Sequence, residues 1–190
     1  MNLRCKLVSF IANTKKAPEY TKLTYLGFDG NSWIDKGIYA NNNTKIETTY
    51  LPKFLEKALY GVSEANKNIT AYISDRGSWR FGSESIVWVS HTDVLYHSVQ
   101  NKEGVTINGA TNSYSAQSDF VSGYTVLIGK QNLKTFSPFV GNIYGFKIYE
   151  NDDIALDLIP VLDKHGEPCM YDLVNEAFYY NQGTGQFTYG

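Results

Sequence analysis

Charge of one sign is nowhere concentrated in this sequence. The 190 residues contain 17 lysines and arginines against 19 aspartates and glutamates, and basic residues cluster only in short pairs such as Lys15-Lys16. Proteins that bind nucleic acid gain most of their affinity by neutralising phosphates and usually carry a basic stripe. The charge distribution therefore argues against a nucleic-acid partner.

Long hydrophobic runs are also missing. A membrane-spanning helix needs about 18 consecutive apolar residues, and no stretch approaches that length, so we expect no membrane insertion. The chain is 43% hydrophobic and 19% charged, which excludes a highly charged disordered protein. A domain of this size buries roughly two-thirds or more of the surface that its unfolded chain exposes. It therefore needs no disulfide or metal to fold.

Cysteine is scarce. Cys5 and Cys169 lie near opposite ends of the chain, and neither belongs to a Cys-x-x-Cys motif or a Cys/His cluster. Zinc sites need such clusters, so we expect none. A single bridge between the two cysteines stays open, but the sequence favours two unpaired thiols.

The N-terminal segment does not have the pattern of a secretion signal. Its apolar stretch, residues 7–12, is short, is interrupted by Ser9 and leads into polar residues. Alternation from Leu3 to Phe10 instead predicts an edge strand or a docking arm. We expect residues 1–18 to form this arm and residues 19–190 to form one domain.

Aromatic residues are abundant, at 15% of the chain, with 15 tyrosines, 10 phenylalanines and 3 tryptophans. Short runs of β-favouring residues alternate with glycine, asparagine and aspartate turn signals. These runs are residues 25–26, 33–34, 45–51, 57–63, 69–74, 79–82, 86–89, 94–100, 105–107, 124–129, 143–149, 154–159, 170–174 and 177–180. Residues 110–118 predict a loop, and residues 52–58 predict at most a short helix. A dozen or so strands without βαβ alternation predict an all-β sandwich or barrel.

The C-terminal third carries a distinctive motif, in residues 141–149, 157–160, 170–175, 178–179 and 183–187. This motif resembles that of concanavalin A-like, LamG-type jelly-roll domains, which recur in bacteriophage virion proteins and in surface proteins of gut bacteria. The opening strands of that family are similar to residues 25–26, 33–37 and 44–47. The resemblance spans about residues 20–190 and implies a jelly-roll sandwich of two antiparallel sheets.

The motif residues have mainly structural roles under this interpretation. Phe146 and Ile148 are expected on one face of their strand, with their neighbours on the other. Gly183 and Gly185 are expected to allow a turn with positive φ. Asp157 and Asp172 are expected to accept local hydrogen bonds near strand ends.

Some domains of this fold are glycosidases that use the pattern Glu-x-Asp-x-x-Glu, in which two carboxyl groups lie about 5 Å apart. The nearest match here starts at Glu150 and Asp152, but Ala155 stands where the third acid should be, and the segment falls on a predicted turn. Other acids are scattered without a defensible pair. We therefore expect no enzymatic activity, while a distant pair that meets in space stays open.

Calcium is the one cofactor that the resemblance raises, because LamG-type and legume-type lectins often bind it through aspartate, asparagine and carbonyl oxygens. Asp29, Asn31 and residues 151–153 offer such oxygens. Aspartate, asparagine and glycine are also ordinary turn residues. We expect no metal here, with calcium as the alternative.

Sugar binding has its own candidates. An aromatic ring can pack on the C–H face of a pyranose while polar side chains bond its hydroxyls. Trp33 and Trp88 alternate with apolar neighbours and are expected in the core, whereas Trp79 is expected to be exposed. The predicted glycan-binding residues are Tyr72, Arg76, Trp79 and Arg80.

The resemblance implies a noncatalytic phage virion protein, such as a fibre, decoration or tail-associated subunit. Its jelly roll would face outward and touch host-surface glycans, and its arm would dock to other virion proteins or to a symmetry mate. A homo-oligomer, by analogy a trimer, would be assembled in the host cytoplasm. A carbohydrate-binding module or adhesin of a bacterial surface is the alternative, and a glycoside hydrolase is a third, because fold alone does not fix function.

Overall fold

The computed structural model describes residues 18–115, 118–133 and 137–190, and every regular element in these ranges is a β-strand. The strands are β1 (Tyr20–Lys22), β2 (Leu26–Asp29), β3 (Ile34–Asn41), β4 (Thr44–Pro52), β5 (Lys57–Val62), β6 (Asn68–Ile73), β7 (Gly77–Gly82), β8 (Glu84–Trp88), β9 (Tyr96–Asn101), β10 (Gly104–Ile107), β11 (Ala110–Ser113), β12 (Val121–Ile128), β13 (Ser137–Pro138), β14 (Val140–Glu150), β15 (Asp153–Asp163), β16 (Pro168–Asp172), β17 (Ala177–Tyr179) and β18 (Thr188–Tyr189).

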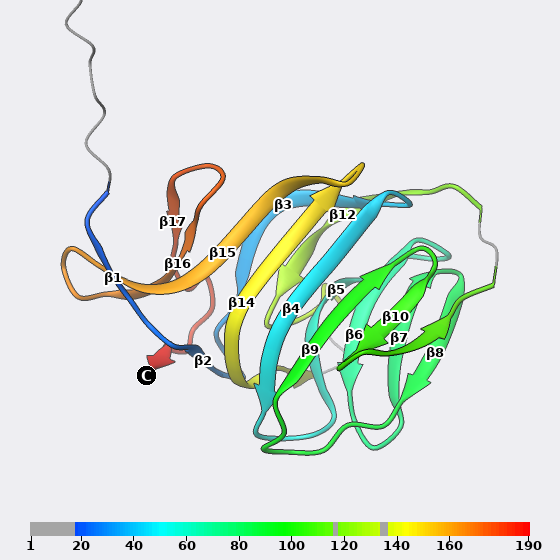
Figure 1. Cartoon of the computed structure of the whole chain (residues 1–190), viewed down its shortest axis with the longest axis horizontal. Helices are drawn as coiled ribbons and strands as arrows, with labels where there is room; N and C mark the ends of the chain where they lie inside the picture. The colour runs from blue at the N-terminus through cyan, green and yellow to red at the C-terminus, as the bar shows by residue number, and fades with distance from the viewer. Residues whose placement is uncertain (1–17, 116–117, 134–136) are drawn as a thin grey trace, which may run out of the picture.

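These strands form two sheets that pack face to face. The larger sheet has the order β11-β10-β9-β4-β14-β15-β16-β17, with β2 also beside β14, β18 beside β2 and β1 beside β15. The smaller sheet has the order β3-β12-β5-β6-β7-β8, and the short β13 pairs in parallel with β5. In Figure 1 the strands β9, β4, β14 and β15 lie in front of β12, β5 and β6. The predicted two-sheet antiparallel sandwich is confirmed.

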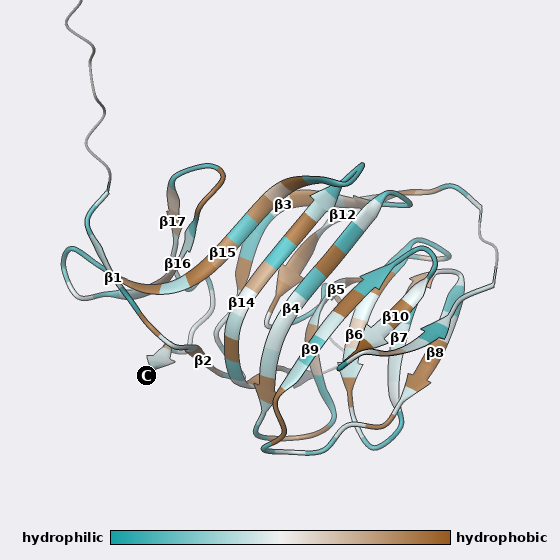
Figure 2. Cartoon of the chain, viewed as in Figure 1, coloured by the Kyte–Doolittle hydropathy of each residue, from teal (hydrophilic) through white to brown (hydrophobic). Residues whose placement is uncertain are grey.

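Strand β14 lies at the centre of the larger sheet, between β4 and β15. Phe146 and Ile148 point into the core and are almost completely buried, as the alternation predicted. Strand β4 alternates in the same way, and Figure 2 shows the resulting succession of apolar and polar residues along both strands. The apolar faces of these two strands form the central part of the larger sheet's inner face.

Aromatic side chains join the two sheets across the core. Tyr60 on β5 packs edge-on against Phe146 on β14, with ring centroids 5.4 Å apart. The same ring also meets Trp79 on β7 edge-on, at 6.0 Å. Such edge-to-face pairs add to the stabilisation from apolar burial, so Tyr60 links the smaller sheet both internally and to its partner.

A buried amide completes this junction. Gln100 on β9 is fully buried; its Oε1 accepts the Tyr60 hydroxyl at 2.8 Å, and its Nε2 donates to the Arg80 carbonyl oxygen at 2.9 Å and to the Tyr114 hydroxyl oxygen at 2.8 Å. Arg80 lies on β7, so this side chain from the larger sheet bonds directly to the backbone of the smaller one. Buried polar groups with satisfied partners fix one arrangement of the packed layers.

The C-terminal hairpin of β16 and β17 confirms the prediction for residues 170–180. Asp172 is fully buried at its base, where its Oδ1 accepts the backbone N–H groups of Asp157 at 3.1 Å and Val174 at 3.0 Å. Its Oδ2 accepts Nδ2 of Asn175 at 2.5 Å. The expected role of Asp172 as a hydrogen-bond acceptor near a strand end is therefore confirmed, whereas Oδ2 of Asp157 lies 3.3 Å from Nζ of Lys147 on the neighbouring strand.

Two sequence predictions of local structure were wrong. Residues 110–118 were predicted as a loop, but β11 pairs with β10 across a turn in which Asn108 and Gly109 have φ of 48° and 85°. Both residues therefore adopt the left-handed backbone that a tight hairpin requires. The short helix predicted over residues 52–58 is also absent from the described chain, because β4 runs to Pro52 and β5 starts at Lys57.

Gly183 and Gly185 are needed for a reason other than the predicted one. Neither has a positive φ. A side chain at Gly183 would collide with the carbonyl oxygen of Asn31, and one at Gly185 would collide with the carboxylate of Asp29. These glycines let the C-terminal segment lie directly against the turn that follows β2.

The predicted N-terminal arm lies outside the described residues, apart from its last residue, Pro18. Cys5 lies in the same segment, so the possible bridge between Cys5 and Cys169 also falls outside them. Cys169 is buried on β16, and burial raises the pKa of its thiol to about 12. Within the described ranges, no helix has the length and apolar character needed to cross a membrane.

Replacing Gln100 with leucine should cost about 3 kcal/mol of folding free energy, since it leaves two hydroxyls and a carbonyl without their buried partner. Chemical denaturation would measure the loss. Gln186→Leu is the matched control because Gln186 is exposed, and it should change stability by less than about 0.5 kcal/mol. Equal stability of the two variants would show that the Gln100 amide does not join the sheets.

Candidate functional site

The outer face of the smaller sheet is polar where β6 and β7 run side by side. The two strands pair Thr70 with Arg80 and Ala71 with Trp79. Side chains alternate across a strand, so Arg80 faces solvent on this outer face and Trp79 faces the core.

Trp79 is completely buried, and the prediction that it is exposed and binds glycan was therefore wrong. It shares its phase along the strand with Phe81, which is also fully buried. The polar neighbours Ser78 and Arg80 reflect the outward phase of β7 and do not imply an exposed tryptophan. Trp33 and Trp88, predicted in the core, are only half-buried.

Two of the predicted glycan-binding residues do lie together. Tyr72 is half-buried and Arg80 is exposed, and both line a shallow hollow on the outer face. Arg76 is exposed in the turn between β6 and β7 and does not line it. The complete lining is Ser63, Thr70, Tyr72, Ser78, Arg80 and Gln131.

Gln131 is the unusual member of this lining. Only 6% of its surface is exposed, yet no hydrogen bond within the described residues engages its side-chain amide. The amide atoms of Gln131 are not among the buried side-chain atoms of the described chain that have no partner, so they reach the solvent at the hollow. An accessible amide without a hydrogen-bond partner is a group available to a ligand.

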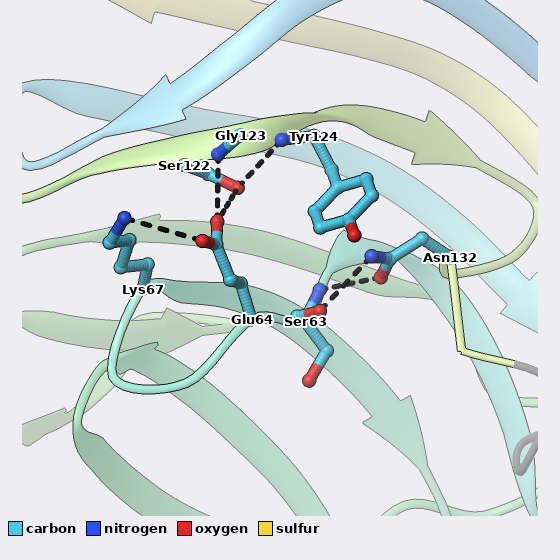
Figure 3. Close-up of polar contacts among 7 residues, drawn as sticks. All are labelled: Ser63, Glu64, Lys67, Ser122, Gly123, Tyr124 and Asn132. Atoms are coloured by element: carbon cyan, nitrogen blue, oxygen red, sulfur yellow. Dashed lines mark hydrogen bonds and ion pairs between the residues drawn. The ribbon is translucent and has the colours of Figure 1, made fainter.

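Both neighbours of Gln131 anchor the segment that presents it. Asn132 accepts the backbone N–H of Ser63 at 2.7 Å and donates Nδ2 to the Ser63 carbonyl oxygen at 3.0 Å (Figure 3). Nζ of Lys130 lies 3.5 Å from the centroid of the Trp33 ring. Burial lowers the pKa of Lys130, against the opposing effect of Asp35. Gln131 is therefore held between two fixed contacts.

Hydrogen bonds hold the side chains at the base of the hollow in place. The Ser78 hydroxyl lies 2.9 Å from that of Ser85 on the neighbouring strand. Nε of Arg80 donates to the Ser78 oxygen at 3.3 Å. No salt bridge within the described chain engages Arg80, so its guanidinium keeps donors for a ligand.

A carboxylate beside the hollow joins β12 to the turn after β5. Glu64 accepts the Gly123 backbone N–H at 2.7 Å and the Ser122 hydroxyl at 3.0 Å, and Nζ of Lys67 lies 3.3 Å away (Figure 3). The Gly123 hydrogen bond is the main cause that lowers the pKa of Glu64. Glu64 is thus an ionised side chain that holds β12 against the turn after β5. Tyr124, which is 54% exposed, points toward Asn132 in Figure 3.

Sequence reasoning missed Ser63, Thr70, Ser78 and Gln131. Ser78 and Thr70 could have been found, because each lies in the outward phase of a predicted strand. Gln131 and Ser63 could not have been found in this way. They are brought together by the hydrogen bond between Ser63 and Asn132, which are 69 positions apart in the sequence.

The candidate calcium ligands form ordinary turns. Asp29 accepts the backbone N–H of Asn31 at 2.8 Å through Oδ1 and that of Gln186 at 2.9 Å through Oδ2. Burial alone would raise the pKa of Asp29, but these and other hydrogen bonds outweigh it and lower the pKa. Within the described ranges, no group of three or more histidine, cysteine, aspartate or glutamate side chains could hold a metal. The absence of a metal cofactor stays a prediction.

The incomplete glycosidase pattern also falls on a turn, as predicted. Glu150 ends β14 and accepts Nδ2 of Asn41 at 2.6 Å and the Thr44 hydroxyl at 2.5 Å. Asp152 lies in the turn before β15 and pairs with Lys45 at 3.4 Å. Both carboxylates therefore have local partners.

Replacing Glu64 with glutamine should destabilise the protein at neutral pH and have less effect in acid. The folded pKa of Glu64 lies below its ordinary value of 4.5. Its contribution is therefore complete above about pH 4.5 and is lost as the pH falls through the lower folded pKa. Thermal unfolding of wild type and variant from pH 7 to pH 3 would test this.

The control for this pH series is Glu103→Gln, because Glu103 is exposed and its carboxylate has no salt bridge in the described chain. It should follow the wild type at every pH. A constant difference between wild type and Glu64→Gln across the range would contradict an ionic role for Glu64.

Comparisons with known proteins give little beyond the fold. No protein-family model and no curated protein matches this chain. Among solved structures, the chain is similar to a native heptameric SAP-like pentraxin from Limulus polyphemus, with 12% identity and a TM-score of 0.47 over 70% of this chain and 77% of that chain. A likeness of this size does not indicate what the chain binds.

Proposed function

We propose that this protein is a noncatalytic glycan-binding module and that it binds sugar on the outer face of the smaller sheet, over the small hollow of about 20 Å³. The observation that supports this most directly is Gln131, whose side-chain amide has no hydrogen-bond partner within the described chain and lies at the hollow. This amide offers two donors and one acceptor, which a ligand with matching hydroxyls can bond.

The rest of the lining has the chemistry that sugars require. Thr70 and Ser78 supply hydroxyls, Arg80 supplies charged donors, and the half-buried ring of Tyr72 supplies an apolar surface beside them. A pyranose presents a ring of hydroxyls around apolar C–H faces. Polar groups that converge around one aromatic surface can therefore orient it.

The setting that we propose is a bacteriophage virion, in which the module is a fibre, decoration or tail-associated subunit. The support is the resemblance of residues 20–190 to LamG-type domains of virion proteins. Residues 1–18 would then dock the module to other virion proteins, and the hollow would face host-surface glycans. A module of a bacterial surface would use the same hollow and differ only in where the protein is found.

A glycan array with purified protein tests the binding proposal. Tyr72→Ala and Gln131→Ala should each weaken binding of the best glycan at least tenfold, about 1.4 kcal/mol. Tyr189→Ala is the matched control, because Tyr189 is 50% exposed on β18, in the other sheet, and it should bind like the wild type. Repeating the array in a chelator would show whether calcium takes part.

Three outcomes would contradict the proposal. They are a folded protein that binds no glycan on the array, binding that survives both substitutions in the hollow, and release of reducing sugar from the bound polysaccharide. The first would leave a structural subunit whose partners are proteins. The second would place the site elsewhere, and the third would make the protein a glycosidase.

A further inference from the structure

One edge of the smaller sheet is closed by the chain itself. Strand β3 forms this edge, and the segment after β17 lies against its start. Asn181 Oδ1 accepts the backbone N–H of Trp33 at 3.1 Å, and Gln182 Oε1 accepts that of Asp35 at 3.0 Å. The Gln182 backbone N–H donates to the Trp33 carbonyl oxygen at 2.9 Å. These bonds leave little of the start of β3 for another strand.

The opposite edge is open. Strand β8 pairs with β7, and no other strand in the described chain pairs with it. Val87 is 63% exposed, and Val89, just after the strand, is 53% exposed. Figure 2 shows the apolar end of β8 at the margin of the sheet. Monomeric proteins usually protect such an edge with lysine, proline or a covering segment, whereas the one charged residue within β8 is Glu84 at its start.

We propose that β8 pairs with β8 of a second copy of this chain in an antiparallel, two-fold dimer centred on Val87. A two-fold axis places the same strand on both sides of the joint, so the edge must complement itself. In this register Val87 lies opposite its own symmetry mate, Ile86 lies opposite Trp88, and Ser85 lies opposite Val89.

This register fits the side chains better than its neighbour. Val87 packs beside its own symmetry mate and Val89 beside Ser85, and Ile86 meets Trp88 on the core side of the sheet. Glu84 falls opposite Ser90, so no like charges face each other across the joint. A register centred on Ile86 would instead oppose Glu84 to Trp88 and would separate the two copies of Val87, each of which would face Ser85.

The dimer and the glycan site are separate claims. Strand pairing extends a sheet in its own plane, so it would leave the outer face, and the hollow on it, uncovered. The interface can therefore fail while glycan binding stands, and the reverse also holds.

Sedimentation and light scattering of the full chain test the interface first. The wild type should be a dimer, and Val87→Lys should weaken dimerisation at least tenfold, because it places two lysines opposite each other at the centre of the joint. Val121→Lys is the matched control, because Val121 is 65% exposed at the start of β12, and it should remain dimeric. Circular dichroism would confirm that both variants are folded.

Cross-linking tests the register. In a Cys5→Ser background, Val87→Cys should form a disulfide-linked dimer on mild oxidation, because residues at the two-fold centre face each other at the Cα separation that a disulfide needs. Val121→Cys should remain reduced. A wild-type monomer, a trimer insensitive to Val87→Lys, or equal cross-linking of the two cysteine variants would each overturn the proposal.

Discussion

The contact between the two sheets at Tyr60 and Gln100 is the constraint on which the rest of this structure depends. Tyr60 packs against Phe146 across the core, and its hydroxyl is held by an amide that also bonds the backbone of β7. An aromatic contact alone tolerates sliding of one sheet over the other. The amide does not, because a shift would leave its buried partners unsatisfied. The register of the layers is thereby fixed at β7, the strand that also carries Arg80 into the hollow.

Because the inner faces are filled by this core, exposed chemistry is confined to the outer faces, the edges and the loops. The backbone and the side chain of Arg80 lie on opposite sides of this division. Its carbonyl oxygen accepts a hydrogen bond from Gln100 inside the sandwich, while its side chain lines the hollow outside. The position of the guanidinium is therefore tied to the core packing rather than to a flexible loop. A site built in this way is preorganised, which reduces the entropy lost on binding.

Sequence patterns predicted what depends on local periodicity and missed what depends on distant contacts. Phe146 and Ile148 were correctly placed on one face of their strand, which the structure shows to be the buried face, because period two is a property of the strand itself. The error at Trp79 came from treating polar neighbours as a sign of exposure, although in a strand they indicate the opposite face. Gln131 had no local signal, since its place is set by Ser63 and Trp33, which contact its neighbours from far away in the sequence. The glycines at 183 and 185 were noticed for the wrong reason, because steric collision with residues 29 and 31 cannot be read from a turn motif.

Those same glycines explain why the two edges of the smaller sheet differ. Their lack of side chains brings the C-terminal segment against the turn before β3, where Asn181 and Gln182 then reach the backbone of that strand. No other strand in the described chain pairs with β8, so within those residues that edge keeps its backbone groups and its exposed valines. In the dimer that we propose, the smaller sheet is therefore extended only at β8. Since β6 and β7 lie next to that side, a second copy would extend the sheet close to the hollow without covering it, and two hollows would share one continuous outer face. Assembly and ligand binding are then compatible because one uses the edge of the sheet and the other uses its face.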